Sequence, residues 1–494
     1  MKNYILAIDQ GTTSSRAIIF DKKGAYIASS GQEFTQHFPK PGWVEHDQGD
    51  IWGGVVKSCQ QAIEKADISA EMIAGIGITN QRETVFLWDK ETGEPVYKAI
   101  VWQDRRTSDF CKTLKSQGHE LEVQKRSGLL LDPYFSASKI AWVLDNVEGA
   151  RERAEKGVLL FGTSETFLLW HFTKGKSHFT DISNASRTCL FNIHTQDWDD
   201  ELLSLFKVPR SILPEIKENI DDFGVIDREI LGAEIPIVAM AGDQQAASFG
   251  QGCFEPGMIK STYGTGAFVL KNVGTTVKES AHKLLSTVAW KIKGVTHYAL
   301  EGSVFVAGSA IQFLRDGLEI LEDASQSEAI AETLASNDGV YFVPALTGLG
   351  APYWNADARG VICGLTRGTT SAHLVRAALE AQAYQTKDLL DAMEKDTGIK
   401  IKALRVDGGL VKNNWACQFM ADILDVTVDR PVITETTALG VAMMVAIGVG
   451  FFDNEEDVTK LWQLDRRFDV SMTFEERNTL YNGWKKAVER CALA

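Results

Sequence analysis

The chain starts with the run that decides its fold, Ile5-Leu-Ala-Ile-Asp9-Gln-Gly-Thr-Thr-Ser-Ser-Arg16-Ala-Ile-Ile-Phe20. Two apolar, β-branched segments flank a turn of glycine, threonine and serine, which predicts a β-hairpin. Gly11 lets the backbone come close to a ligand, and the loop hydroxyls and amides can donate to phosphate oxygens. Asp9 can hold a metal ion through water, and Arg16 adds a cation. The run indicates a nucleotide-phosphate site, although a plain surface hairpin would give the same pattern.

A second run with this pattern follows the midpoint of the chain, Met258-Ile-Lys-Ser-Thr-Tyr-Gly-Thr-Gly-Ala-Phe-Val-Leu270. It predicts another hairpin and suggests two duplicated halves, although one shared motif is weak evidence for a repeat. We therefore expect an N-terminal domain over 1–250 and a C-terminal domain over 251–494, packed together across a cleft. Short apolar runs alternate with helical patterns, which is typical of an α/β protein with mixed sheets.

The composition narrows the choice of partners. The 494 residues carry a net charge of −15 and show no long basic run, which argues against nucleic acid or an anionic membrane as the main partner. The seven cysteines are scattered and form no Cys-x-x-Cys, as expected of free thiols in the cytoplasm. A long, apolar and uncharged stretch, Thr436 to Phe452, falls short of a membrane span and predicts a buried helix followed by a turn.

Two polar segments follow predicted strands and carry candidate chemistry. Arg82 and Glu83 are adjacent in a bend, where one side chain can donate to a hydroxyl and the other can accept from the next. That pair suits a small polyol, and a solvated ion pair is the alternative. Asp243 stands where a strand gives way to a helix, so it is either a carboxylate that takes a proton or a helix N-cap.

Other features are less specific on their own. The turn Asp407-Gly-Gly leads from a strand into a helix, and its glycines would let a nucleotide lie close to the backbone, with Asn413 beside it. A plain strand-to-helix turn has the same composition. Trp102 and Tyr134 read as core residues from their chemistry alone. The sequence has neither a Walker-type phosphate loop nor a Gly-x-Gly-x-x-Gly after a strand.

Together these motifs resemble those of the sugar- and polyol-kinase family, which has the actin-like ATPase fold. The resemblance runs from the first strand to the last helix, in order and at sensible spacing. The matching motifs are DQGTTSSR (9–16), PGWVEHD (41–47), GITNQRET (77–84), DPYFS (132–136), NASRT (184–188), AGDQQAA (241–247), TYGTG (262–266), GLGAPYW (348–354), GLTRG (364–368) and RVDGG (405–409).

The resemblance implies two ribonuclease-H-like domains that flank an active-site cleft and close on their substrates. It also implies ATP-dependent phosphorylation of glycerol to sn-glycerol 3-phosphate, the entry step of glycerol catabolism, with Mg²⁺ and in a homo-oligomer. Asp243 would be the general base. The residues that would bind the polyol are Arg82, Glu83, Trp102, Tyr134, Asp243, Gln244 and Phe268.

The resemblance also assigns the nucleotide and metal sites. Asp9 and Asp243 would hold Mg²⁺, through water. The residues that would face the phosphates or surround the rest of the nucleotide are Thr12, Thr13, Ser14, Arg16, Thr265, Gly308, Gln312, Gly409 and Asn413.

Two rival readings remain, and two controls known in the family look absent. Kinases of larger sugars typically carry Gln-Met-His-Gly where this chain has Asn80-Gln-Arg-Glu83. A non-enzymatic, actin-like ATP-binding protein would keep the hairpins but need no polyol site. The stretch 227–234 lacks the Gly-Gly…Arg pattern through which enteric members are inhibited by fructose 1,6-bisphosphate. The chain has no histidine between His194 and His282, so activation through a phosphorylated loop histidine is not expected.

Overall fold

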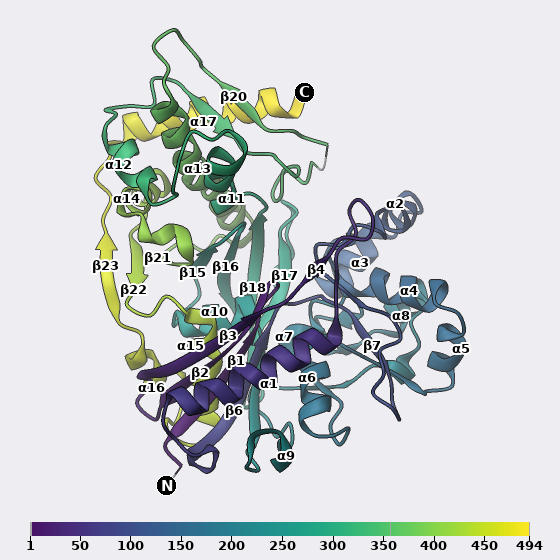
Figure 1. The fold of residues 1–494 in the computed structure, drawn as a ribbon. Helices are drawn as coiled ribbons and strands as arrows, with labels where there is room; N and C mark the ends of the chain where they lie inside the picture. Colours follow the sequence, from purple (N-terminus) through teal and green to yellow (C-terminus); the bar gives the residue numbers. More distant parts are fainter. Residues whose placement is uncertain (1, 356, 494) are drawn as a thin grey trace.

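Two β-sheets form the framework of the molecule (Figure 1). The structure, a computed structural model, describes residues 2–355 and 357–493. The first sheet has the order β14 (Ile237–Gly242), β6 (Ile73–Asn80), β1 (Tyr4–Gln10), β2 (Ser14–Asp21) and β3 (Tyr26–Glu33). The second has the order β17 (Leu285–Ile292), β18 (Val295–Val304), β16 (Ala267–Gly274), β15 (Met258–Tyr263), β21 (Ala403–Asp407), β22 (Val428–Pro431) and β23 (Leu464–Phe468).

Both predicted hairpins are present, and their strands pair with the rest of each sheet in the same way. β1 and β2 are antiparallel up to the pair Gln10 and Ser15, and β15 and β16 up to Tyr263 and Ala267. The first strand of each hairpin then pairs in parallel with a later strand, β1 with β6 and β15 with β21. Because ligands of such sheets gather at the carboxyl ends of parallel strands, each hairpin turn lies at the edge where a site is expected.

The first sheet is covered on both faces. α1 (Gln48–Lys65) packs on β2 and β3, and its N-cap Asp47 accepts hydrogen bonds from the backbone of Gly49 and Asp50. α15 (Thr436–Gly448), the buried helix predicted from the uncharged stretch, packs on β1, β6 and β14 although it comes from the second half of the chain. Helical segments from both halves of the sequence therefore enclose one sheet.

α15 also crosses α10 (Asp243–Gly250) at very short distance. A Cβ on Gly440 would lie 1.8 Å from the carbonyl oxygen of Ala246, and one on Gly250 would lie 2.1 Å from that of Thr436. Glycine is therefore required at both positions. The crossing fixes α10, whose first residue is Asp243, against the body of the molecule.

The second sheet carries helices of its own, green to yellow in Figure 1. They include α13 (Ser371–Thr397), α14 (Asn414–Leu424) and α17 (Phe474–Leu493). Tyr384 of α13 stacks on Trp484 of α17, with ring centroids 5.3 Å apart.

A further block of chain, blue in Figure 1, lies beside both sheets. It includes β7 (Phe86–Asp89), β8 (Ala99–Ile100), α4 (Ser136–Asn146), β9 (Leu159–Gly162), α6 (Ser164–Phe172) and α7 (Ile182–Ala185). α7 contacts β17 of the second sheet, so this block bridges the two sheets beside the site.

The described residues were also searched for membrane-spanning helices and for disulfide bonds. None of their helices is both long and apolar enough to cross a membrane. All seven cysteines are free thiols, six of them buried and Cys363 partly so.

Candidate active site

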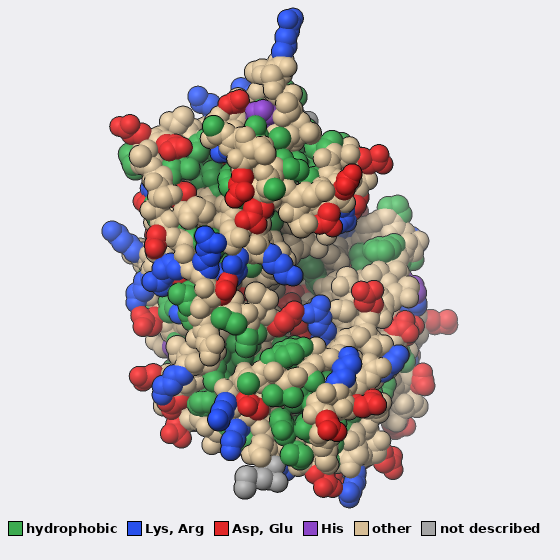
Figure 2. Space-filling view, turned by 60° about the vertical axis from the view of Figure 1, so that its left-hand side comes forward, with side chains coloured by type: hydrophobic (Ala, Val, Ile, Leu, Met, Phe, Trp, Pro, Cys, Tyr) green, Lys and Arg blue, Asp and Glu red, His purple; other side chains and the backbone are tan. Residues whose placement is uncertain are grey.

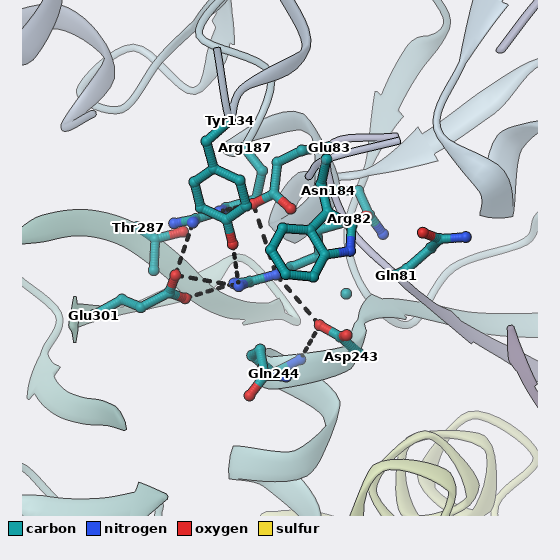
Figure 3. A network of polar contacts seen from close by, with 12 residues as sticks. Gln81, Arg82, Glu83, Tyr134, Asn184, Arg187, Asp243, Gln244, Thr287 and Glu301 are labelled. Carbon is teal, nitrogen blue, oxygen red and sulfur yellow. Dashed lines mark hydrogen bonds and ion pairs between the residues drawn. The ribbon is translucent and has the colours of Figure 1, made fainter. Parts of the chain in front are cut away.

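The candidate site lies where β6 and β14 end. These strands pair in parallel, with Gly242 opposite Asn80, so the residues that follow them meet at one edge of the sheet. Arg82 and Asp243 come together there, with Nε of Arg82 3.3 Å from Oδ1 of Asp243 (Figure 3). The surface is hollowed between the upper and lower parts of the molecule, as the space-filling view shows (Figure 2).

Arg82 is buried, with only 2 % of its side chain exposed, and its donors are largely used. Nη1 donates to Oε2 of Glu301 at 2.6 Å, and Nη2 donates to Oε1 of Glu301 at 3.1 Å and to the Tyr134 hydroxyl at 3.3 Å. Burial alone would lower the pKa of Arg82, but the carboxylates of Glu301 and Glu83 raise it well above its usual range. Arg82 is therefore a fixed cation rather than a solvated surface charge.

Glu83 is buried beside it in a strained backbone conformation. Its φ of 61° lies in the left-handed region, which costs a residue with a side chain roughly 1–3 kcal/mol and is often found at functional sites. Oε1 of Glu83 accepts a hydrogen bond from Nε of Arg187 at 2.7 Å. Burial raises the pKa of Glu83, although Arg82 and Arg187 act in the other direction. The bend places the Glu83 carboxylate 3.8 Å from Nε of Arg82, and contact of either residue with a polyol stays a prediction.

Asp243 is the first residue of α10 and not its N-cap, which is Gly242. Its Oδ1 accepts a hydrogen bond from the backbone N–H of Gln244 at 2.6 Å. Burial raises the pKa of Asp243, while Arg82 and Lys260 lower it and keep the carboxylate form accessible. A carboxylate with a raised pKa is a better proton acceptor, so its setting suits a general base.

Lys260 of β15 supports this pair from the second sheet. Its buried ammonium donates to Oε1 of Gln244 and to Oγ1 of Thr262, the latter at 3.0 Å. Burial lowers the pKa of Lys260 to about 8, against the opposing effect of Asp407 and Asp243. The contact fixes the Gln244 side-chain oxygen, so the direction of that predicted substrate ligand is set by the opposite sheet.

Three aromatic rings form one wall beside the charged cluster. The ring of Trp102 meets those of Tyr134 and Phe268 edge to face, at centroid distances of 5.6 and 6.0 Å. Trp102 Nε1 donates to Oγ1 of Thr12 at 3.0 Å, so this wall touches the first hairpin turn. Trp102 and Phe268 are only partly buried, so neither ring is fully enclosed by the core.

The two hairpin turns present the predicted phosphate ligands. Thr12 and Thr13 occupy the turn between β1 and β2, and Ser14 is the first residue of β2. Nη1 of Arg16, two residues further along β2, binds Glu435 at 2.9 Å. The Arg16 side chain is therefore paired with the carboxylate of Glu435.

Thr265 occupies the second turn, and α11 (Gly308–Gln312) begins directly against it. The carbonyl of Thr265 accepts from the N–H of Ala307 at 2.9 Å, and Gly308 N–H donates to Gly264 at 2.9 Å. A Cβ on Gly308 would lie 2.6 Å from the Gly264 carbonyl oxygen. This close packing brings Thr265, Gly308 and Gln312 into one region, as the predicted nucleotide site requires.

The Asp-Gly-Gly turn lies against the second hairpin as well. Gly408 has φ 93°, and a Cβ there would lie 2.5 Å from the Tyr263 carbonyl oxygen. Gly409 opens the next turn, and its missing Cβ would meet nothing within 4 Å. Asn413 caps α14, since its Oδ1 accepts from Ala416 N–H at 2.8 Å, and its amide donates to Ser327 at 3.2 Å. Asn413 therefore has a structural role at this strand-to-helix turn, and a nucleotide contact of Asn413 stays a prediction.

Asp9 and Asp243 form the acidic edge assigned to the metal. Burial raises the pKa of Asp9 to about 7, and the nearby charges of Asp243 and Glu435 add to the rise. Carboxylate oxygens that repel each other suit a hydrated divalent cation, which would relieve the repulsion. No group of three or more metal-ligating acidic, histidine or cysteine side chains was found within 2–355 and 357–493, so water would have to complete the coordination shell.

Sequence reasoning did not single out three residues of this cluster, Arg187, Glu301 and Lys260. Arg187 stands in the NASRT motif, which marked its region but not its role. Glu301 and Lys260 lie on the largely buried strands β18 and β15, and a charged residue inside a buried strand was the available signal.

The fold and site define a class, a two-domain kinase with the actin-like ATPase architecture. The model of the FGGY family of carbohydrate kinases matches twice, its N-terminal domain over residues 4–250 and its C-terminal domain over 259–449. The chain belongs to the FGGY family of carbohydrate kinases.

The chain is similar over nearly its whole length to two glycerol kinases and a xylulose kinase. It is 56 % identical over 490 residues to a glycerol kinase of Bacillus cereus (strain AH187), covering 99 % of both chains. It matches the crystal structure of Plasmodium falciparum glycerol kinase with ADP at TM-score 0.94 and 37 % identity, covering 99 % and 98 % of the two chains. A xylulose kinase of Lactobacillus acidophilus matches at TM-score 0.89 and 22 % identity, covering 98 % and 97 %, which shows a shared fold alone.

Proposed function

We propose that this kinase transfers the terminal phosphoryl group of ATP to glycerol and forms sn-glycerol 3-phosphate. The observation that carries the proposal is the cluster formed by the buried Arg82 and Glu83 and the partly exposed Asp243, beside a wall of three aromatic rings. A polyol needs donors and acceptors for adjacent hydroxyls and an apolar surface for its carbons, and this cluster offers both. The similarity to glycerol kinases over the whole chain supports the same choice.

The polar groups divide the binding work among them. Arg82 donates to a substrate hydroxyl, and Glu83 accepts from the neighbouring one. Gln244 and the Tyr134 hydroxyl form hydrogen bonds with the remaining polar groups of the polyol. Trp102 and Phe268 cover the carbon atoms and keep water from the reacting hydroxyl, which would otherwise compete as the phosphoryl acceptor.

The chemical step needs one proton acceptor and well-placed phosphates. Asp243 takes the proton of the attacking hydroxyl as a new bond forms between its oxygen and the γ-phosphorus, while the bond from that phosphorus to ADP breaks. Thr12, Thr13, Ser14 and Thr265, with the backbone amides of their turns, hold the phosphates. Mg²⁺ held at Asp9 and Asp243 would supply charge neutralisation for the phosphate oxygens.

The nucleotide and domain assignments extend this proposal. We place the adenosine part of ATP near Gly308, Gln312, Gly409 and Asn413, which lie on the second lobe. We place the domain boundary at 250/251; the two family matches, over residues 4–250 and 259–449, support a boundary in this region. The free state of all seven cysteines suits a reducing compartment, so we place the enzyme in the cytoplasm. We expect a homo-oligomer by resemblance to the family, and light scattering of the purified protein tests it.

The proposal is tested by ADP release in a coupled assay with a panel of polyols and sugars at equal concentration. Glycerol is expected to give the highest kcat/KM, because Arg82 and Glu83 replace the Gln-Met-His-Gly pattern of kinases for larger sugars. A preference for xylulose or gluconate would overturn it. ATP binding with no turnover of any alcohol would favour an actin-like binding protein instead.

A further inference from the structure

Glu301 occupies an unusual place in the site, because it reaches the substrate arginine from the opposite sheet. It lies on β18 (Val295–Val304) and is fully buried. Both of its oxygens accept from Arg82, at 2.6 and 3.1 Å, and Oε1 also accepts from Nη2 of Arg187 at 2.8 Å (Figure 3). Arg82 follows β6 of the first sheet and Arg187 follows α7, so one carboxylate joins three separate parts of the chain.

The contact fixes the direction of the Arg82 guanidinium. A planar guanidinium that is bound through both terminal nitrogens cannot rotate about its long axis. Glu301 binds this outer edge, which turns Nε toward Asp243 at 3.3 Å. Without Glu301, Gln245 and the Tyr134 hydroxyl would be the remaining partners of the terminal nitrogens among the described residues, at 3.2 and 3.3 Å. The donor geometry at the substrate side therefore depends on a residue that does not face the substrate.

Arg187 extends the same arrangement to Glu83. Its Nε donates to Glu83 Oε1 at 2.7 Å while its Nη2 holds Glu301. Its buried Nη1 has no hydrogen-bond partner among the described residues. The charges alternate along the chain of contacts Glu83, Arg187, Glu301, Arg82, and the four groups together carry no net charge. The acceptor and the donor offered to the polyol are thus fixed by one neutral network.

We propose that Glu301 is a positioning residue for glycerol: it orients Arg82 directly and Glu83 through Arg187, so that the polyol site is complete only when the two sheets stand in this arrangement. This inference rests on the proposed function. It makes glycerol affinity, rather than ATP affinity, the property that Glu301 controls.

The test measures steady-state kinetics of wild type, Glu301→Gln and Glu301→Asp with glycerol and with ATP varied separately. Glu301→Gln is expected to raise the KM for glycerol at least tenfold and to change the KM for ATP less than twofold. Glu301→Asp keeps the charge but is one methylene shorter, so we expect a smaller rise of about threefold to tenfold and hence partial rescue relative to Glu301→Gln.

Glu380→Gln is the matched control. Glu380 of α13 is equally buried and binds an arginine, with Nε of Arg376 2.8 Å from its Oε1, but it lies outside the site. Its loss is expected to lower the melting temperature and to leave both KM values within twofold of wild type. A general loss of packing would instead affect the two Glu301 variants and the control alike.

The outcomes separate this inference from the proposed function. A folded Glu301→Gln with an unchanged KM for glycerol overturns the inference, and so does an equal rise in the KM values for glycerol and ATP. If Glu301→Gln does not fold, the charge-conserving Glu301→Asp decides by the same criterion. Absence of glycerol turnover by the wild type would overturn the proposed function itself, which no behaviour of the variants can do.

Discussion

Replacement of Asp243 by asparagine tests the assignment of the general base. Asparagine has nearly the shape of aspartate and keeps an oxygen for the backbone N–H of Gln244, now 2.6 Å from Oδ1. The change removes the group that takes the hydroxyl proton and removes the negative charge 3.3 Å from Nε of Arg82. Arg82 keeps its two hydrogen bonds to Glu301, so the rest of the site should stay in place.

The expected magnitude follows from these roles. A positioned general base contributes about 10²–10⁴ in rate, or about 2.7–5.5 kcal/mol of barrier. We therefore expect kcat to fall by about two to four orders of magnitude. ATP affinity should be largely preserved, because the hairpin ligands are untouched and Asp9 and the asparagine oxygen remain for Mg²⁺.

The Asp243→Asn substitution should lower kcat but raise the thermal stability of the protein. Burial raises the pKa of Asp243 above its unfolded value, so the folded state binds the proton more tightly and the ionised form destabilises it. The stabilisation linked to this group is present below the unfolded pKa and is lost as the pH rises through the folded one. At neutral pH the neutral asparagine avoids that cost. The Asp243→Asn protein should therefore melt at or above the temperature of the wild type at pH 7.5.

The assay combines coupled ADP release, calorimetric titration of ATP and thermal melting. Asp388→Asn serves as control, since burial also raises the pKa of Asp388, to about 6, while its partners Tyr481 and Trp484 lie on α17 away from the site. The control should keep the kcat of the wild type. A kcat for Asp243→Asn within tenfold of wild type would refute its role as base.

Three further predictions concern other parts of the chain. Phe268→Ala removes one ring of the aromatic wall and should raise the KM for glycerol about fivefold, since about 1 kcal/mol of carbon burial is lost; an unchanged KM would take Phe268 out of the site. Lys139 donates to the carbonyl oxygens of residues 133, 134 and 135 at 2.9, 2.7 and 2.8 Å. Lys139→Met leaves these acceptors unpaired and should lower both the melting temperature and glycerol affinity, because the Tyr134 segment loosens; a rise in melting temperature contradicts this. Fructose 1,6-bisphosphate should leave initial rates unaffected, because the stretch 227–234 lacks the Gly-Gly…Arg pattern. Strong inhibition would contradict this prediction.

The fold was largely predictable because its decisive elements are local. The two Gly/Thr turns between apolar runs required only strand periodicity and turn chemistry, and both hairpins are present. The uncharged stretch after residue 436 was expected to be a buried helix. Its packing on the first sheet could not be predicted, because this depends on glycines at 250 and 440 that meet only in three dimensions.

The site was predictable where motif and chemistry coincide and not where charges meet across the sheets. Arg82, Glu83 and Asp243 were identified because each follows a strand end. Glu301 and Lys260 stand in buried strands with no motif, and only the tertiary contact explains a charge there. Asn413 shows the converse, since its chemistry fits a nucleotide ligand while its side chain already caps α14.

The most direct measurement is a crystal structure of the protein with glycerol and ADP. We expect the carbon atoms of glycerol to pack against the wall that includes Trp102 and Phe268. Its hydroxyls should lie in hydrogen-bond contact with Arg82, Glu83 and Asp243. Glycerol bound at another place, or a complex in which Arg82 turns away from Asp243, would contradict the account.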